Sequence, residues 1–205
     1  MNVTLIQQTE NPIETIAKIA SICYDSNPKN PMGLVKHLYK NGHHSVFEHI
    51  YFTFKIEGIS RACSHQLVRH RQASFTQRSQ RYCSEDGFGY VVPPKVSNEM
   101  GEASRAYFEA IDQIKQGYKK LTSLGIPNED ARFLLPNACE TELYMSCNLR
   151  ELMHIANERL CSRAQWEIRE LVRQMVDLVD PELKFMLVPK CQSGRIICKE
   201  KYEKI

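Results

Sequence analysis

The stretch from Arg69 to Tyr82 constrains the fold of this chain more than any other. Its fourteen positions hold four arginines, a histidine, two serines, a threonine and three glutamines. A helix that is polar on every face has no side to pack, so part of this stretch must be a loop or a surface that contacts a ligand. Arginine suits phosphate and carbonyl groups, while Ser, Thr and Gln add neutral donors and acceptors. We therefore predict an anion-binding loop for a phosphorylated, nucleotide-like ligand.

Length and charge restrict the choice of partner. The chain has 205 residues and a formal net charge of +3. This length fits a single domain, residues 1–205, which can bury about 70% of its unfolded surface. A domain that binds duplex nucleic acid usually has a stronger, clustered excess of positive charge. Here the basic excess is confined to one short span, so the predicted partner is a small anion and not nucleic acid.

The cysteines indicate a reducing compartment and no metal site. The chain has eight cysteines and no Cys-x-x-Cys pair. Cys191 and Cys198 alone offer two ligands without a nearby histidine, so we favour no metal. No apolar run follows Met1, as a signal peptide would require, and no stretch approaches the length of a membrane span. We therefore predict a cytoplasmic protein with reduced cysteines and no contact with a membrane.

Apolar periodicity predicts a chain of helices and strands. Ile50, Phe52, Phe54 and Ile56 alternate with polar residues, which is typical of a strand with one buried face. Other strands are predicted at Val3–Gln7, Tyr90–Pro94 and Thr141–Cys147. Helices are predicted from Pro12, around Leu34–Tyr39, over Ser60–Arg71, over Met100–Leu121, from Asn128, from Asn148 and after Ser162. In the long helix the predicted apolar face is Met100, Ala103, Tyr107, Ala110, Ile114, Tyr118 and Leu121.

The segment from His43 to His49 has three interpretations. Ser45 and Glu48 fit a capping box, which would make the segment an ordinary helical turn. Its three histidines could suggest a metal site, but no array of carboxylates or cysteines completes one. The segment could also face a cofactor from a loop.

The residues taken by themselves, before any comparison with a family, indicate a nucleotide-binding α/β protein. We favour an enzyme over a protein that only binds its ligand. Neither Gly-x-x-x-x-Gly-Lys nor Gly-x-Gly-x-x-Gly occurs. Ser79 lies among arginines but has no evident general base, so a ligand-binding hydroxyl is the better hypothesis. One alternative is a nucleotide- or RNA-binding module without catalysis, and another is a helical assembly protein with a basic surface. An arginine on a helix surface, such as Arg159, is by default a solvated charge.

Several blocks resemble one family in the same order along the chain. Arg69-His70-Arg71, seven further residues and then Ser79-Gln80-Arg81-Tyr82 resemble the signature of the flavin-dependent thymidylate synthases, the ThyX family. The upstream block Gly42–His49, followed by Phe52-Thr53-Phe54, is similar to the family as well. Downstream, the resemblance extends to Ala131-Arg132, Leu135-Pro136, Asn148-Leu149-Arg150, Arg159 and Ala164-Gln165-Trp166-Glu167.

This resemblance implies a reaction and an architecture. The reaction is the reductive methylation of dUMP to dTMP, with methylenetetrahydrofolate as carbon donor, FAD as hydride relay and NADPH as reductant. The protein would bind and orient the cofactor and the substrates and would polarise the reacting groups, while the cofactor supplies the redox chemistry. The implied fold is α/β (α+β), with helices packed around a twisted, mainly antiparallel sheet. The implied assembly is a homotetramer whose active sites are shared between subunits.

The resemblance also assigns residues to ligands. Those that would contact FAD are Ser45, Arg69, His70, Arg71, Gln77, Asn148, Arg150 and His154. Those that would surround dUMP are Gln66, Arg69, Gln77, Arg78, Ser79, Gln80, Arg81, Arg132 and Arg159. Arg159 would approach the pyrimidine and stabilise negative charge on the uracil ring, because Arg stays protonated and only donates hydrogen bonds. No covalent enzyme nucleophile is expected.

Four positions depart from the commoner family pattern. Thr76 stands where Asn is usual, Gln77 where Glu is frequent, His154 where Asn is frequent and Arg163 where His is frequent. All four keep hydrogen-bonding ability, so the departures put individual contacts in question and not the activity. Gln77 in place of Glu also argues against an obligatory base at that position.

Overall fold

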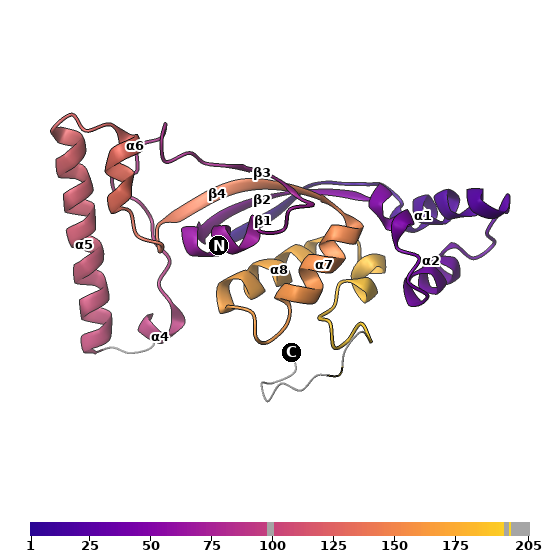
Figure 1. Ribbon diagram of the computed structural model, residues 1–205. Helices are drawn as coiled ribbons and strands as arrows, with labels where there is room; N and C mark the ends of the chain where they lie inside the picture. The colour runs from indigo at the N-terminus through magenta and orange to yellow at the C-terminus, as the bar shows by residue number, and fades with distance from the viewer. Residues whose placement is uncertain (98–100, 195–196, 198–205) are drawn as a thin grey trace. The chain divides into compact units, whose positions relative to one another are not determined.

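The computed structural model describes residues 1–97, 101–194 and 197, which form two compact units (Figure 1). Unit 1 comprises residues 1–2, 57–66 and 76–143. Unit 2 comprises residues 3–56, 67–75 and the described residues from 144 onward.

The described residues form a four-stranded sheet in the order β1-β2-β4-β3. Its strands are β1 (Asn2–Gln8), β2 (Tyr51–Ser60), β3 (Ser74–Gln77) and β4 (Glu140–Asn148). The sheet is antiparallel, which confirms the predicted fold class. The predictions for β1, β2 and β4 are also confirmed. The stretch from Arg69 to Tyr82 was predicted to be a loop in part, but residues 74–77 within it form an edge strand, which needs partners on one side only.

Strand β2 has the alternating burial that its sequence predicts. In unit 2, the side chains of Phe52, Phe54 and Ile56 are at most 1% exposed, whereas Tyr51 is 58% exposed. Figure 1 shows α7 and α8 together on one side of the strands. The opposite face of this part of the sheet presents Ile6, Tyr51 and Tyr144 as exposed side chains. The sheet thus has one buried face and one open face, as antiparallel sheets commonly do.

In unit 2, α1 (Pro12–Ser21) packs against α2 (Pro31–Lys40). Helix α2 ends in a Schellman motif, in which Gly42 has φ 78° and the N–H of His43 donates to the carbonyl of Leu38. The remaining helical segments of this unit are η1 (Ile22–Tyr24), η2 (Ser45–His49), α7 (Leu149–Arg159), α8 (Trp166–Leu178) and η4 (Pro181–Met186).

Two helix predictions in the site region were wrong in detail. Helix α3 (Arg61–Leu67) ends before Arg69, since Val68 and Arg69 are exposed and offer no apolar face that would continue the helix. The Ser45–Glu48 capping box does not form. Segment η2 is a 3₁₀-helix whose N-cap residue is His44, with no side-chain cap hydrogen bond, and Glu48 pairs with Arg150 instead.

Unit 1 is built around the long helix α5 (Glu102–Ser123). Phe88, Ile111 and Cys139 form its core, with Tyr107 and Ile114 packed against them. Ala103 and Ala110, which were predicted to be on the apolar face, are exposed, and Met100 lies outside the described residues. The other helical segments among its described residues are α3 up to Gln66, α4 (Pro94–Ser97), α6 (Asn128–Ala131) and η3 (Arg132–Leu134).

Two other predictions in unit 1 need correction. Tyr90–Pro94 is not a strand, because within the described chain it makes a single β-bridge, between Tyr90 and Cys139. Asn128 does not cap α6, because the N-cap residue is Pro127. The proline side chain has no hydrogen-bond acceptor.

The seven cysteines among the described residues are free thiols. Cys198 lies outside the described residues. Within residues 1–97, 101–194 and 197, no group of three or more His, Cys, Asp or Glu side chains is placed to hold a metal ion. Across the same residues, no helix combines the length and the apolar character needed to cross a bilayer.

Candidate functional site

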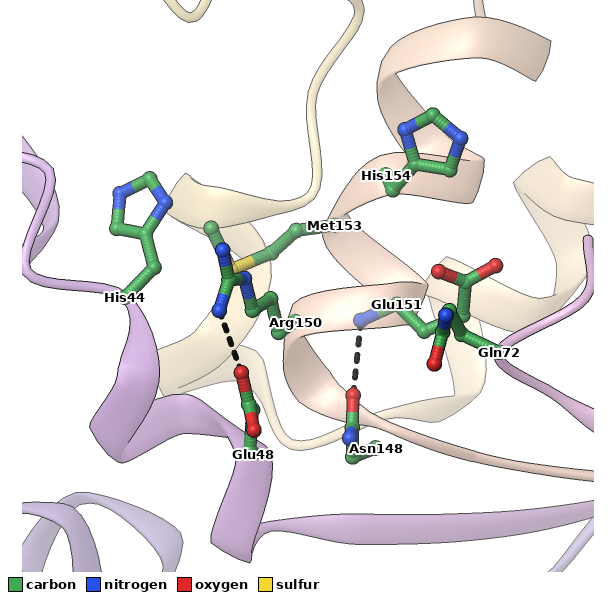
Figure 2. Close-up of a pocket in the computed structure, with 8 residues that line it drawn as sticks. All are labelled: His44, Glu48, Gln72, Asn148, Arg150, Glu151, Met153 and His154. Carbon is green, nitrogen blue, oxygen red and sulfur yellow. Dashed lines mark hydrogen bonds and ion pairs between the residues drawn. The ribbon is translucent and has the colours of Figure 1, made fainter.

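Unit 2 contains a polar cavity of about 520 Å³ at the start of α7 (Figure 2). Three of the residues predicted to contact a cofactor, Asn148, Arg150 and His154, belong to its lining. The complete lining is His44, Glu48, Gln72, Asn148, Arg150, Glu151, Met153 and His154. Amide, guanidinium and imidazole groups therefore converge on one space, as in sites that bind a polar ligand.

The sequence around Asn148 explains why α7 presents these groups. The Asn148 side chain accepts a hydrogen bond of 2.9 Å from the backbone N–H of Glu151, which confirms Asn148 as the predicted N-cap. Arg150 and His154 are four residues apart and share a face of the helix, where both are exposed. The apolar face of α7, including Leu152 and Ile155, is buried.

Arg150 forms an ion pair with Glu48 from η2, as Figure 2 shows. The two residues are separated by 102 positions in the sequence. A ligand phosphate that approached Arg150 would compete with this carboxylate. The assignment of Arg150 to FAD stays a prediction.

His70 and Arg159 meet in unit 2 although they are 89 positions apart. The Nε–H of Arg159 donates to Nε2 of His70 at 3.0 Å. On its other side, Nδ1 of His70 lies 3.7 Å from Oε1 of Glu151, and the His70 ring makes an edge contact with the ring of His154. The central residue of the Arg-His-Arg motif therefore lies between the predicted catalytic arginine and the cavity.

Burial lowers the pKa of His70 from 6.5 to about 4, and the nearby charges of Arg159 and His154 act in the same direction. The imidazole is consequently neutral at pH 7 and can accept a hydrogen bond from arginine. Burial also raises the pKa of Glu151 above its ordinary value.

The shift of His70 predicts a loss of stability in acid. Between pH 6.5 and about pH 4 the unfolded chain binds a proton at His70 that the folded chain does not, so stability falls as the pH falls through this window. The full difference corresponds to about 3 kcal/mol of unfolding free energy. Denaturant unfolding at pH 7 and pH 4.5 should show that the free energy of unfolding falls less between these pH values in His70→Gln than in the wild type. His65→Gln, at an exposed histidine, is the control. Equal pH dependence in His70→Gln and the wild type would contradict the prediction.

Three other predicted cofactor residues of unit 2 lie on its surface. Ser45 begins η2, while Arg69 and Arg71 follow α3, and all three are exposed. They lie outside the lining of the cavity that is described above. Their contacts with FAD stay predictions.

Most of the predicted dUMP residues belong to unit 1, and their side chains already have partners there. Gln77 donates to the hydroxyls of Ser64 at 2.9 Å and Thr141 at 3.2 Å. Gln80 is 9% exposed, and its amide lies 3.6 Å from the sulfur of Cys139. Gln66 lies in α3 and is half-buried.

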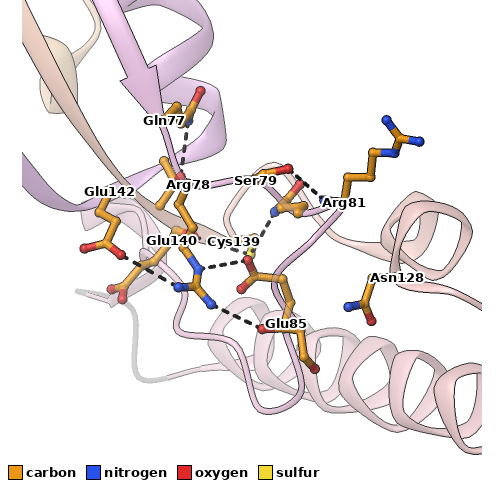
Figure 3. Close-up of polar contacts among 12 residues, drawn as sticks. Gln77, Arg78, Ser79, Arg81, Glu85, Asn128, Cys139, Glu140 and Glu142 are labelled. Atoms are coloured by element: carbon orange, nitrogen blue, oxygen red, sulfur yellow. Dashed lines mark hydrogen bonds and ion pairs between the residues drawn. The ribbon is translucent and has the colours of Figure 1, made fainter.

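Arg78 lies in an acidic cleft of unit 1 (Figure 3). Its Nε is 3.3 Å from Oε1 of Glu85, and its Nη1 is 3.7 Å from Oε1 of Glu142. Two carboxylates therefore offset the charge of this guanidinium. A phosphate would have to displace them, so the surroundings of Arg78 do not favour its predicted role as a phosphate ligand.

Glu129 connects two other predicted phosphate ligands in unit 1. Arg81 donates from Nε to the Glu129 carboxylate at 2.6 Å, and Arg132 donates from Nε to the Glu129 backbone carbonyl at 3.0 Å. Ser79 is close in the chain, and its hydroxyl accepts from the backbone N–H of Arg81 at 3.2 Å. Glu129 thus links Arg81 and Arg132, and its carboxylate offsets the charge of Arg81 as Glu85 and Glu142 offset that of Arg78.

Sequence reasoning missed several residues of these sites. For Glu48 a place facing a cofactor was one of three interpretations, and Glu151, Gln72 and Glu129 had no predicted part in a site. Glu129 begins a short helix that an arginine follows, but many surface helices share this pattern. No local signal identifies Glu48, Glu151 or Glu129, because each meets its partner through a long-range contact.

Comparisons with known proteins identify the family. The family model described as "Thymidylate synthase complementing protein" matches residues 4–183. The flavin-dependent thymidylate synthase of Geobacter sulfurreducens is 45% identical over 192 residues, covering 87% of this chain and 82% of that protein. The enzyme of the same name from Pyrococcus furiosus is 40% identical, covering 93% of this chain and 86% of that protein.

Solved structures share the fold. A UMP/dUMP methylase from Streptomyces cacaoi, bound with 5-Br dUMP, matches with a TM-score of 0.80 at 25% identity over 90% of this chain and 93% of its own. Thymidylate synthase X from Helicobacter pylori, crystallised with FAD and dUMP, matches with a TM-score of 0.76 at 21% identity over 91% of this chain and 97% of its own. This likeness, the family model and the relatives agree with the motifs around Arg69, and the chain belongs to the flavin-dependent thymidylate synthase family.

Proposed function

We propose that this protein is a flavin-dependent thymidylate synthase that reductively methylates dUMP to dTMP. Methylenetetrahydrofolate supplies the carbon, and NADPH is the reductant. The observation that supports this best is the contact of His70 with Arg159. It joins the family's Arg-His-Arg motif to the predicted catalytic residue, next to a cavity lined by predicted cofactor ligands.

The donor set of the unit 2 cavity fits part of FAD. Asn148, Gln72 and His154 offer neutral hydrogen-bonding groups for a heterocycle or a sugar, and Arg150 offers a charged donor. FAD, when bound, would supply the hydride chemistry of the reaction. The chain's own residues would hold and orient it, with Ser45, Arg69 and Arg71 as further ligands.

We assign the dUMP phosphate to the arginines around Glu129 in unit 1, where it would replace the Glu129 carboxylate beside Arg81. Glu129 holds both Arg81 and Arg132 by Nε, and a guanidinium held in this way has a fixed plane. A phosphate favours such planar donors, and the Ser79 hydroxyl adds a neutral one. Gln77 and Gln80 have ordered partners of their own, which suits positioning rather than acid–base chemistry.

Arg159 suits the stabilisation of charge on the uracil ring. A guanidinium stays protonated, and its N–H groups can donate to a carbonyl oxygen on which negative charge develops. Such a donor stabilises the ring form that carries negative charge, and in this form C5 can act as the nucleophile toward the folate-derived carbon. This role needs no covalent bond between enzyme and substrate.

A homotetramer with shared active sites is also part of the proposal. The open sheet face of unit 2, with Ile6, Tyr51 and Tyr144 exposed, supports self-association, because apolar side chains gathered on a surface are typical of interfaces. A cytoplasmic location is proposed as well, in agreement with the free thiols of the described cysteines.

The purified protein should be yellow, with flavin absorbance, and should oxidise NADPH in a manner that depends on dUMP and methylenetetrahydrofolate. Chromatography should then identify dTMP as the product. UMP in place of dUMP is an informative second substrate, since one structural relative is a UMP/dUMP methylase. A colourless protein that neither binds added FAD nor converts dUMP would refute the proposed function.

A further inference from the structure

Three side chains of unit 2 form a chain of polar contacts, with a hydrogen bond from Arg159 to His70 and a longer electrostatic contact between His70 and Glu151. The Arg159 Nε–H donates to His70 Nε2 at 3.0 Å, and His70 Nδ1 lies 3.7 Å from Glu151 Oε1. His70 is 5% exposed and Glu151 is 7% exposed, so both groups are largely removed from water. Buried polar groups in such a chain hold one another in defined orientations.

The contacts determine which nitrogen of His70 holds the proton. Arginine can only donate, so Nε2 must be the acceptor of this hydrogen bond. A neutral imidazole with an accepting Nε2 has its proton on Nδ1, and Nδ1 is the nitrogen that faces the Glu151 carboxylate. A carboxylate at this position favours the same tautomer by attracting the N–H.

The other charged groups around His70 leave this assignment unchanged. His154 contacts the ring edge, and Glu158 and Arg159 act on His70 from the same helix. The net result is a pKa well below 6.5, which keeps the imidazole neutral. Protonation of His70 would place a hydrogen on Nε2 and remove the acceptor that Arg159 uses.

A fixed His70 has a direct consequence for Arg159. The guanidinium is planar, so a hydrogen bond at Nε sets the directions in which both Nη nitrogens point. A donor that stabilises charge in a transition state must be oriented before the reaction, and small misplacements are costly.

We propose that Glu151 is a positioning residue, which holds His70 in its Nδ1–H tautomer and thereby orients the Arg159 guanidinium toward the pyrimidine. The inference rests on the proposed function, because it needs Arg159 at the substrate. Glu151 is the new element, since the family resemblance assigns it to no ligand.

The capping role of this position can be separated from the carboxylate. The cap uses the backbone N–H of Glu151, which donates to the Asn148 side chain. Glu151→Gln keeps this N–H and the size of the side chain, but removes the negative charge that faces His70. The variant should therefore preserve α7, and it is compared with the wild type at saturating FAD, because Glu151 also lines the unit 2 cavity.

A double-mutant cycle on dUMP affinity tests the proposal. The FAD-loaded wild type, Glu151→Gln, Arg159→Ala and the double variant are titrated with dUMP by calorimetry, and kcat is measured where turnover remains. Glu151→Gln should weaken dUMP binding and lower kcat, each by about tenfold, as is usual when the partner of an active-site ligand is lost. In the Arg159→Ala background the same change should alter dUMP affinity less than about twofold, because Glu151 acts through Arg159.

The control is Glu170→Gln, which removes a carboxylate from an exposed ion pair with Arg173 on α8 and should leave binding and turnover unchanged. The proposal would be overturned if Glu151→Gln weakened dUMP binding equally in the wild type and in Arg159→Ala. It would also be overturned if Glu151→Gln alone kept the dUMP affinity and kcat of the wild type. If Glu151→Gln does not fold, a cycle of His70→Gln with Arg159→Ala applies the same criterion. If the wild-type protein binds neither FAD nor dUMP, the proposed function is overturned as well. If the wild type binds both ligands and the effects of Glu151→Gln and Arg159→Ala on dUMP affinity simply add, only the role of Glu151 is overturned.

Discussion

Arg159→Ala should lower the rate of dTMP formation by about a thousandfold while FAD binding stays close to that of the wild type. Loss of a preorganised donor to developing charge typically costs a hundredfold to a thousandfold in kcat, or about 3–4 kcal/mol. FAD binding should persist because Arg159 is absent from the residues that line the unit 2 cavity. The flavin spectrum of the purified variant and a dTMP assay together measure both quantities.

Two further variants define the role of Arg159. Arg159→Lys keeps the charge but loses the planar group that His70 orients, so its rate should lie between those of the wild type and the alanine variant. Arg173→Ala removes the same charge from an exposed site on α8, where Arg173 pairs with Glu170 and Asp177, and should change the rate less than about twofold. Near-normal dTMP formation by Arg159→Ala would contradict the assigned role.

Phe54→Ala should lower the free energy of unfolding by about 3–5 kcal/mol, because it opens a cavity in the core of unit 2. The Phe54 side chain is fully buried and stacks on Phe52 with ring centroids 6.2 Å apart. For a protein of this size the loss corresponds to a fall of about 10 °C in Tm. Denaturant titration followed by circular dichroism measures the free energy.

Phe133→Ala is the matched control, since it removes the same atoms from a side chain that is 84% exposed. The unfolding free energy of this variant should stay within about 0.5 kcal/mol of the wild type. Equal losses in the two phenylalanine variants would mean that the burial of β2 does not determine stability.

The periodic elements of the fold could be predicted from the sequence. The alternation from Ile50 to Ile56 predicted β2 and its buried face, and Asn148 predicted the start of α7. In both cases the relevant interactions are local, because neighbouring residues along one element decide which face is buried. The motif around Arg69 also predicted the family, because its residue types and spacing are specific.

The polar segments could be predicted only in part. Residues 74–77 have no apolar face, yet they form β3 because β4 supplies hydrogen-bonding partners. Ser45 and Glu48 have the spacing of a capping box, but Glu48 pairs with Arg150, which is 102 positions away. An ion pair between distant residues depends on the tertiary fold, and no local pattern encodes it.

The same distinction applies to the arginines of the site. The family motifs predict that the guanidinium groups of Arg78, Arg81, Arg132 and Arg159 contact dUMP. Their partners follow from the fold, which places carboxylates beside Arg78, Glu129 between Arg81 and Arg132, and His70 against Arg159. The physical reason is that burial periodicity is a property of one element, whereas the partner of a charged side chain depends on which distant elements the fold brings within hydrogen-bonding distance.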